Sequence, residues 1–280
     1  MSGGTFLLVT GWRPGQRDEE RALEEPYADI PRHLGTPLWS WIKEQLNSER
    51  LWIIAIHLRL RIPDPTDGWN GLDVSMSELI TLVNDQPTLM LDLIEDLLPF
   101  TGNTYGAARN LEAVLAIGNS AYAVRSDNAG LEMRVLPEAK LNVEKAIAAA
   151  DKKGSVGEHL TTAWNAAYGR IPDPAKAYGE SIKAVEGAAA PVLSPNNLKA
   201  TLGTLIGQLK ADAGRYQFAI SVHDAVGMVV ANMQVLWTGQ TSRHGGVEET
   251  LSETVDAAQA AVHLAATLAQ WFQSGAIRRL

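Results

Sequence analysis

The sequence predicts an all-α protein of two helical modules with one small β-hairpin near residues 121–136. Three observations lead to this fold class. Apolar residues recur at helical spacing through most of the chain, signals that start and stop helices frame these segments, and one pair of short runs alternates as strands do. With 280 residues, of which 46% are apolar, the chain is long enough for one large globular domain or two smaller ones.

The first 35 residues are rich in glycine, proline and charge, so we expect an irregular arm over residues 1–35. Thr36 and Pro37 then read as an N-cap followed by proline at the first helical position. Residues 51–62 fit both a strand alternation and a helical stripe, and their helical neighbours favour the helix. The segment P-D-P-T-D-G-W-N-G predicts a loop over residues 63–73.

Short helices are expected over residues 77–84, 88–98 and 105–117, each with one apolar face. Two alternating runs follow, at 121–125 and 131–136, around the turn residues S-D-N-A-G. This pattern indicates a hairpin whose loop is longer than two residues. Residues 36–136 therefore form the predicted N-terminal helical module.

Residues 137–280 are expected to form a helical bundle, because they contain five or six segments with an apolar face joined by short connections. Two of these segments begin with a capping box, at Ser155–Glu158 and Thr250–Glu253, and a third begins at Asp173-Pro174. The expected helices cover residues 142–150, 156–168, 174–190, 198–209, 222–237 and 251–272.

Composition excludes several classes of function. The 32 acidic residues exceed the 24 basic ones, giving a net charge of −8, which argues against a broad electrostatic grip on nucleic acid but leaves room for a small phosphate site. The chain has no cysteine, hence no disulfide and no thiolate metal site. No stretch approaches the ~20 apolar residues of a membrane span, and the start lacks a basic signal-peptide region. We therefore expect a cytoplasmic protein with no membrane partner.

The stretch W-T-G-Q-T-S-R-H-G-G, residues 237–246, concentrates groups that could do chemistry. A helix-helix connection needs no such density of polar side chains, and loops often carry function. An imidazole can transfer a proton near neutral pH and a guanidinium can bind phosphate, so His244 and Arg243 are the candidate catalytic residues for phosphodiester cleavage. The alternative is that both side chains cap neighbouring helix ends.

Glu186 is a further candidate, because it lies at the edge of an apolar stripe and could reach a cleft beside Arg243. The alternative is a surface carboxylate that pairs with Lys183. His57, His159 and His223 show no metal-ligand spacing, and the chain has neither a P-loop nor a G-x-S-x-G motif. We therefore expect no metal and no cofactor.

Of the eight tryptophans, four fall on apolar stripes and are expected to pack in the core: Trp41, Trp164, Trp237 and Trp271. Trp12 and Trp69 lie in predicted loops, and the sequence leaves their role open.

Residues 177–209 read A-Y-G-E-S-I-K-A-V-E-G-A-A-A-P-V-L-S-P-N-N-L-K-A-T-L-G-T-L-I-G-Q-L. With the later L-W-T-G-Q-T-S-R-H-G-G, this segment resembles the C-terminal domain of abortive-infection proteins, a HEPN-like helical bundle. The resemblance covers about residues 138–275. The N-terminal half, including A-Y-A-V and L-E-M-R-V, is similar to the smaller helical module that precedes this domain in uncharacterised actinobacterial proteins.

The resemblance implies a phage-defence or toxin-type protein, often a homodimer, that acts on RNA as a metal-independent RNase. It would place His244 in proton transfer and Arg243 on phosphate, with Gln240, Thr241 and Ser242 positioning the substrate. In that superfamily four to six residues separate the catalytic arginine from the histidine, whereas Arg243 is adjacent to His244, and adjacent side chains diverge. The alternative is thus a non-catalytic binding or assembly protein whose Arg243-His244 loop contacts a partner or nucleotide.

Overall fold

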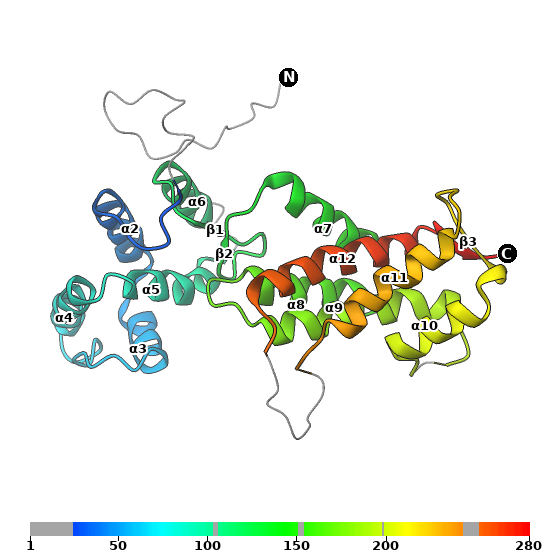
Figure 1. Ribbon diagram of the computed structural model, residues 1–280. Coiled ribbons are helices and arrows are strands. Elements are labelled where there is room, and N and C mark those ends of the chain that lie inside the picture. Colours follow the sequence, from blue (N-terminus) through cyan, green and yellow to red (C-terminus); the bar gives the residue numbers. More distant parts are fainter. Residues whose placement is uncertain (1–24, 103–105, 151–153, 198, 243–251) are drawn as a thin grey trace, which may run out of the picture. The chain divides into compact units, whose positions relative to one another are not determined.

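The computed structural model describes residues 25–102, 106–150, 154–197, 199–242 and 252–280. It is mostly helical with small antiparallel sheets, which confirms the predicted all-α class (Figure 1). The chain divides into two compact units, residues 1–134 and 135–280. Each unit buries its own hydrophobic core. Of the helices in the described part of the chain, none is long and apolar enough to cross a membrane.

The first unit is built around the short helix α5, whose leucines are buried against the other helices. Its apolar face carries Leu89, Leu93 and Leu97 at helical spacing, as the sequence predicts. The elements of this unit are α2 (Arg32–Gln45), α3 (Ser48–His57), α4 (Gly71–Asp85), α5 (Leu89–Leu97), the 3-10 turn η1 (Leu98–Thr101), α6 (Ala107–Ile117), β1 (Tyr122–Val124) and β2 (Leu131–Met133).

The predicted hairpin is confirmed. Strands β1 and β2 pair antiparallel, with Tyr122 opposite Met133 and Val124 opposite Leu131. Arg134, at the end of the hairpin, donates from Nη2 to the Tyr122 carbonyl at 2.9 Å and from Nη1 to a Glu112 carboxylate oxygen at 2.8 Å. The bond to Glu112 attaches the hairpin to α6, and the bond to Tyr122 joins the two ends of the hairpin.

Three predicted boundaries in this unit are wrong. Helix α2 begins at Arg32, inside the predicted arm, and passes through Pro37. Leu34 is buried on the same stripe as Leu38 and its side chain packs against Gly118, so tertiary packing extends the helix backward across the proline. The 51–62 segment is helical only as far as His57. Helix α4 begins at Gly71, six residues before the predicted start.

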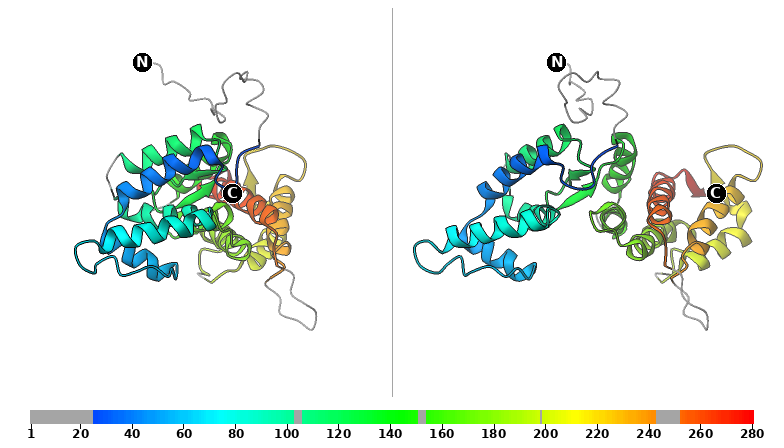
Figure 2. Two further views of the ribbon diagram at one scale, coloured as in Figure 1. Left: turned by 90° about the vertical axis from the view of Figure 1, so that its left-hand side faces the viewer. Right: turned by 60° about the vertical axis from the view of Figure 1, so that its left-hand side comes forward.

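The second unit is a bundle in which α8, α9 and α12 pack side by side, with α7 along α8 and α12 (Figures 1 and 2). Helices α10 and α11 pack on each other, and contact α9 and α12 respectively. The elements of this unit are α7 (Pro137–Ala149), α8 (Val156–Tyr168), α9 (Pro174–Leu193), α10 (Leu202–Ala211), the 3-10 turn η2 (Ala213–Arg215), β3 (Tyr216–Phe218), α11 (Ala225–Thr238), α12 (Val255–Gln273) and β4 (Ile277–Arg279).

The predicted helix starts in this unit have different outcomes. The Asp173 side chain caps α9 by accepting a hydrogen bond from the Lys176 amide at 3.0 Å, as predicted. Ser155 precedes α8 but makes no side-chain cap. Thr250 lies outside the described residues, but the helix start predicted from its capping box is wrong, because residues 252–254 are not helical and Thr254 caps α12 through the Ala257 amide at 3.2 Å. Helix α9 also continues past Pro191 to Leu193.

A second small sheet was not predicted. Strand β3 pairs antiparallel with β4 near the end of the chain, with Tyr216 opposite Arg279 and Phe218 opposite Ile277. Each strand has three residues, too few to show an alternation in the sequence.

The tryptophans predicted to pack in the core do so. Trp41 and Trp164 are buried, and Trp237 and Trp271 are partly buried against the core of the second unit. Trp12 lies outside the described residues.

Candidate functional site

The predicted site lies in the connection between α11 and α12. Helix α11 ends at Thr238, with Gly239 as its C-cap, and α12 begins after Thr254. Arg243 and His244, the candidate catalytic residues, lie outside the described residues. The structure therefore describes the two ends of this connection, residues 239–242 and 252–254.

These two ends are joined by Ser242 and Glu253. The Ser242 hydroxyl donates to Glu253 Oε1 at 2.7 Å, and the Ser242 amide donates to the same oxygen at 2.9 Å. A hydrogen bond to a charged group contributes about 1.5–3 kcal/mol. The pair therefore fixes where the chain leaves α11 and where it returns to α12.

Glu253 is only 7% exposed, which is unusual for a carboxylate. Burial by itself raises the pKa of the Glu253 carboxyl. The hydrogen bonds from the Ser242 amide and hydroxyl, helped by the backbone at Glu253 and Thr241, outweigh burial and hold the pKa below its ordinary value. Glu253 is therefore ionised at neutral pH. Its second oxygen, Oε2, is buried and accepts no hydrogen bond from the described residues.

Tyr178 of α9 packs against the end of α11 at Gly239. A Cβ added to Gly239 would lie 2.2 Å from the Tyr178 hydroxyl oxygen, so only glycine allows this approach. Burial, and secondarily the negative charge of Glu253, raise the pKa of the Tyr178 hydroxyl. Tyr178 therefore stays protonated beside the carboxylate.

Gln240 and Thr241 complete the described part of the connection. The Gln240 amide nitrogen lies near α9, because a Cβ on Gly179 would be 3.6 Å from it. Thr241 is exposed, and its backbone helps to lower the pKa of the Glu253 carboxyl. The structure thus brings Gln240, Thr241 and Ser242 together at the end of α11.

Glu186 lies elsewhere on α9. Its Oε1 accepts the Leu202 amide at 2.6 Å, at the N-terminus of α10, where backbone N–H groups lack partners in their own helix. Glu186 is eight residues beyond Tyr178, a rise of about 12 Å along the helix. Lys183, the partner in the alternative interpretation of Glu186, donates to Glu180 at 2.7 Å.

Two residues of this site were not predicted, Tyr178 and Glu253. Tyr178 lies on the apolar stripe of α9, so the sequence indicates core packing for it. Glu253 fits the last position of the expected capping box. The polar sequence around Ser242 gives no sign that its partner lies eleven residues further along the chain.

A histidine–tyrosine pair joins α8 and α12 outside this site. Burial raises the pKa of Tyr168 and lowers that of His263, so both are neutral at neutral pH. The Tyr168 hydroxyl then donates to His263 Nε2 at 2.8 Å, while Trp164 stacks on Tyr168 with ring centroids 4.2 Å apart. This group connects two helices of the bundle.

A second group joins α8 to α9. Glu180 accepts hydrogen bonds from His159 Nδ1 at 2.6 Å and from Lys183 Nζ at 2.7 Å. Burial by itself raises the pKa of the Glu180 carboxyl. The contacts with Lys183 and His159 outweigh burial, so the pKa of Glu180 is lowered overall. In the described ranges, no three His, Asp or Glu side chains are grouped as metal ligands.

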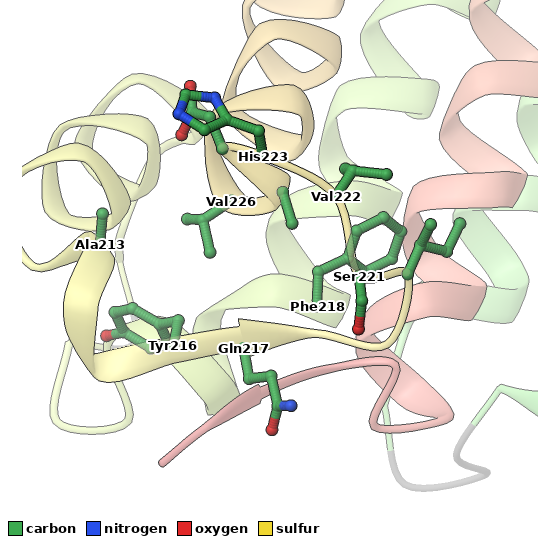
Figure 3. Close-up of a pocket in the computed structure, with 11 residues that line it drawn as sticks. Ala213, Tyr216, Gln217, Phe218, Ser221, Val222, His223 and Val226 are labelled. Carbon is green, nitrogen blue, oxygen red and sulfur yellow. The ribbon is translucent and has the colours of Figure 1, made fainter.

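An open hollow of about 630 Å³ lies between β3 and the first turn of α11 (Figure 3). Tyr216, Phe218 and Val226 line it, together with the polar residues Ser221, His223 and Asp224. The Tyr216 hydroxyl donates to the Leu193 carbonyl, and Figure 3 shows Gln217 pointing away from Val226, where it accepts a bond from Arg278. This hollow therefore offers both apolar and polar contacts.

Comparison of the chain with protein-family models, curated proteins and solved structures found no match. The HEPN-like resemblance therefore remains a prediction.

Proposed function

We propose that this protein is a HEPN-like, phage-defence or toxin-type cytoplasmic protein that acts on RNA through the connection between α11 and α12. The hydrogen bonds from Ser242 to Glu253 carry this proposal, because they close the connection into a loop with a fixed base. A reactive group works best when its support is rigid. This loop includes Arg243 and His244.

The proposed reaction is metal-independent cleavage of a phosphodiester. A ribose hydroxyl attacks the phosphorus as the bond to the leaving oxygen breaks. His244 takes the proton from the attacking hydroxyl while water protonates the leaving oxygen, or gives a proton to the leaving oxygen while water takes that of the hydroxyl, and Arg243 neutralises the charge on the phosphate. Gln240 and Thr241 hold the substrate next to this pair.

A second function, binding without cleavage, is favoured by the position of Ser242. Its amide and hydroxyl are both directed to Glu253, which leaves fewer groups to orient a substrate. Arg243 and His244 are also adjacent, so their side chains diverge in regular backbone. In this case the loop would hold RNA or a partner protein.

We also propose a homodimer that pairs through the outward face of α11. Met228 and Val235 on that face are 53% and 61% exposed. From Ala225 to Ser242 the sequence has no charged residue, so a two-fold contact here brings no like charges together. A Val235→Lys variant is expected to sediment as a monomer while the wild type sediments as a dimer. A wild-type monomer would contradict this part of the proposal.

The test is RNA cleavage without divalent metal by the wild type, His244→Ala and Arg243→Ala. His223→Ala is the matched control, since His223 is an exposed histidine outside the connection. We expect cleavage by the wild type and the control only. Equal cleavage by all four, or none by the wild type on a broad RNA panel, would refute catalysis. RNA binding that needs Arg243 but gives no cleavage would establish the second function.

A further inference from the structure

Trp69 is 95% exposed, although tryptophan has the largest side chain to gain from burial. It lies at the end of the loop that precedes α4, in the first unit. Scattered exposed apolar residues need no explanation. An indole exposed to this extent on an ordered loop is different, because tryptophan is enriched among residues that dominate binding energy at interfaces.

The loop that carries Trp69 is attached to α4 by several contacts. Asp64 Oδ1 accepts hydrogen bonds from the Thr66 amide at 2.8 Å and from the Thr66 hydroxyl at 2.6 Å. The buried Ser75 hydroxyl of α4 donates to the Pro63 carbonyl at 2.8 Å. Gly71 packs so closely that a Cβ there would lie 2.9 Å from the Asp64 carbonyl oxygen. The loop therefore holds its shape without help from the indole.

Along the sequence that follows Arg61 and includes Trp69, the charge has a single sign. Between Arg61 and Arg109 the sequence has eight carboxylates and no lysine, arginine or histidine, which equals the whole formal charge of −8. Asp67 and Asp73, two residues before Trp69 and four after it, are both exposed. Such a surface repels phosphate groups and attracts cations.

The exposed indole and the neighbouring carboxylates together indicate the chemistry of a partner. A guanidinium stacks on an indole face and at the same time donates to carboxylates, and arginine does both better than lysine. We propose that the Trp69 surface, defined as Trp69 with Asp67 and Asp73, docks an arginine-rich segment of another protein. This inference is independent of the function proposed for the second unit.

The test measures binding of a fluorescein-labelled peptide of alternating arginine and glycine to the full chain by anisotropy. Trp69→Ala is expected to weaken binding about tenfold, between the ranges for an exposed and a desolvated cation–π contact, and Trp69→Phe to keep most of it. A double Asp67→Asn, Asp73→Asn variant should bind more weakly and with less dependence on salt. Arg59→Ala with Arg61→Ala is the matched charge control and should not weaken binding.

Equal binding by wild type and Trp69→Ala would overturn the proposal, since acidic charge alone would then attract the peptide. Equal binding of a peptide with citrulline in place of arginine would overturn it as well. Binding to phosphatidylcholine vesicles tests whether Trp69 contacts a lipid surface and not a protein. Binding to vesicles that needs Trp69, with no Trp69-dependent binding of the peptide, would show a membrane contact instead.

Discussion

Ser242 and Glu253 join the end of α11 to the start of α12 through two hydrogen bonds to one buried carboxylate oxygen, at 2.7 and 2.9 Å. Between them the chain carries Arg243 and His244. One side chain thus determines where the candidate loop begins and ends. Tyr178 closes the inner side of the same junction.

Replacing Glu253 with glutamine is expected to lower the free energy of unfolding by about 1–2 kcal/mol, because the charged acceptor is lost from both bonds. Since the folded-state pKa of Glu253 is lowered, its contribution is complete above the ordinary glutamate range and is lost as the pH falls below it. Urea unfolding of both proteins should therefore show a stability gap at pH 7 that narrows as the pH falls below about 4.5.

The control for Glu253 is Asp256→Asn, which removes a carboxylate from the first turn of α12. It should cost at most a few tenths of a kcal/mol, because exposed charges at a helix start contribute little. A Glu253→Gln variant as stable as wild type at pH 7 would show that the Ser242 bonds do not hold the loop.

Gly239→Ala tests the close approach of Tyr178. The added methyl would lie 2.2 Å from the Tyr178 hydroxyl and 2.9 Å from the Val235 carbonyl oxygen, so the ring or the helix end must move. We expect a loss of about 1–3 kcal/mol in the free energy of unfolding, typical of overpacking. Adding Tyr178→Phe removes the clashing oxygen and should restore part of it, which calorimetry can measure. An additive loss would contradict the packing explanation.

Local signals in the sequence predicted which segments form helices better than the residues at which those helices begin and end. The Asp173-Pro174 start of α9 and the β1–β2 hairpin need only neighbouring residues, and both were predicted correctly. The start of α2 depends on Leu34 packing against Gly118, far along the chain. Strands β3 and β4 likewise pair although about 60 residues separate them in the sequence. Contacts of this kind leave no periodic pattern.

The same limit applies to the candidate site. Gln240, Thr241 and Ser242 could be selected from composition, because polar residues are concentrated there. Glu253 could not, since its role depends on a contact across the loop, and a nearby capping pattern gave a competing explanation. The real cap, Thr254, is the next residue. Local competition of this type makes helix starts ambiguous by a few residues.

The substrate role expected for Glu186 stays a prediction, and in the structure its carboxylate accepts the Leu202 amide at the start of α10. Glu186→Ala should therefore lower the free energy of unfolding by about 1–2 kcal/mol, measured by urea unfolding. Thr201→Ala, which removes the cap of the same helix, should have a similar cost. A Glu186→Ala protein of normal stability that no longer acts on RNA would instead establish the substrate role.

His263 gives the protein a predicted stability change near neutral pH. Burial lowers the pKa of His263, so the folded chain takes up a proton less readily than the unfolded chain. The unfolded state therefore binds more protons than the folded state below about pH 6.5. As a result, the free energy of unfolding decreases as the pH is lowered. Wild-type melting temperature should drop between pH 7.5 and pH 5.5. His263→Gln should be less stable at pH 7.5, because it alters the bond with Tyr168, and should lose less on acidification.

Tyr168→Phe separates these two effects. It removes the donor to His263 but keeps the imidazole buried, so it should lower stability at pH 7.5 by about 1 kcal/mol. The pH dependence should remain, because desolvation is the cause of the His263 shift. If Tyr168→Phe abolished the slope, the hydrogen bond and not burial would control the histidine. If His263→Gln kept the full slope, the titrating group would lie elsewhere in the chain.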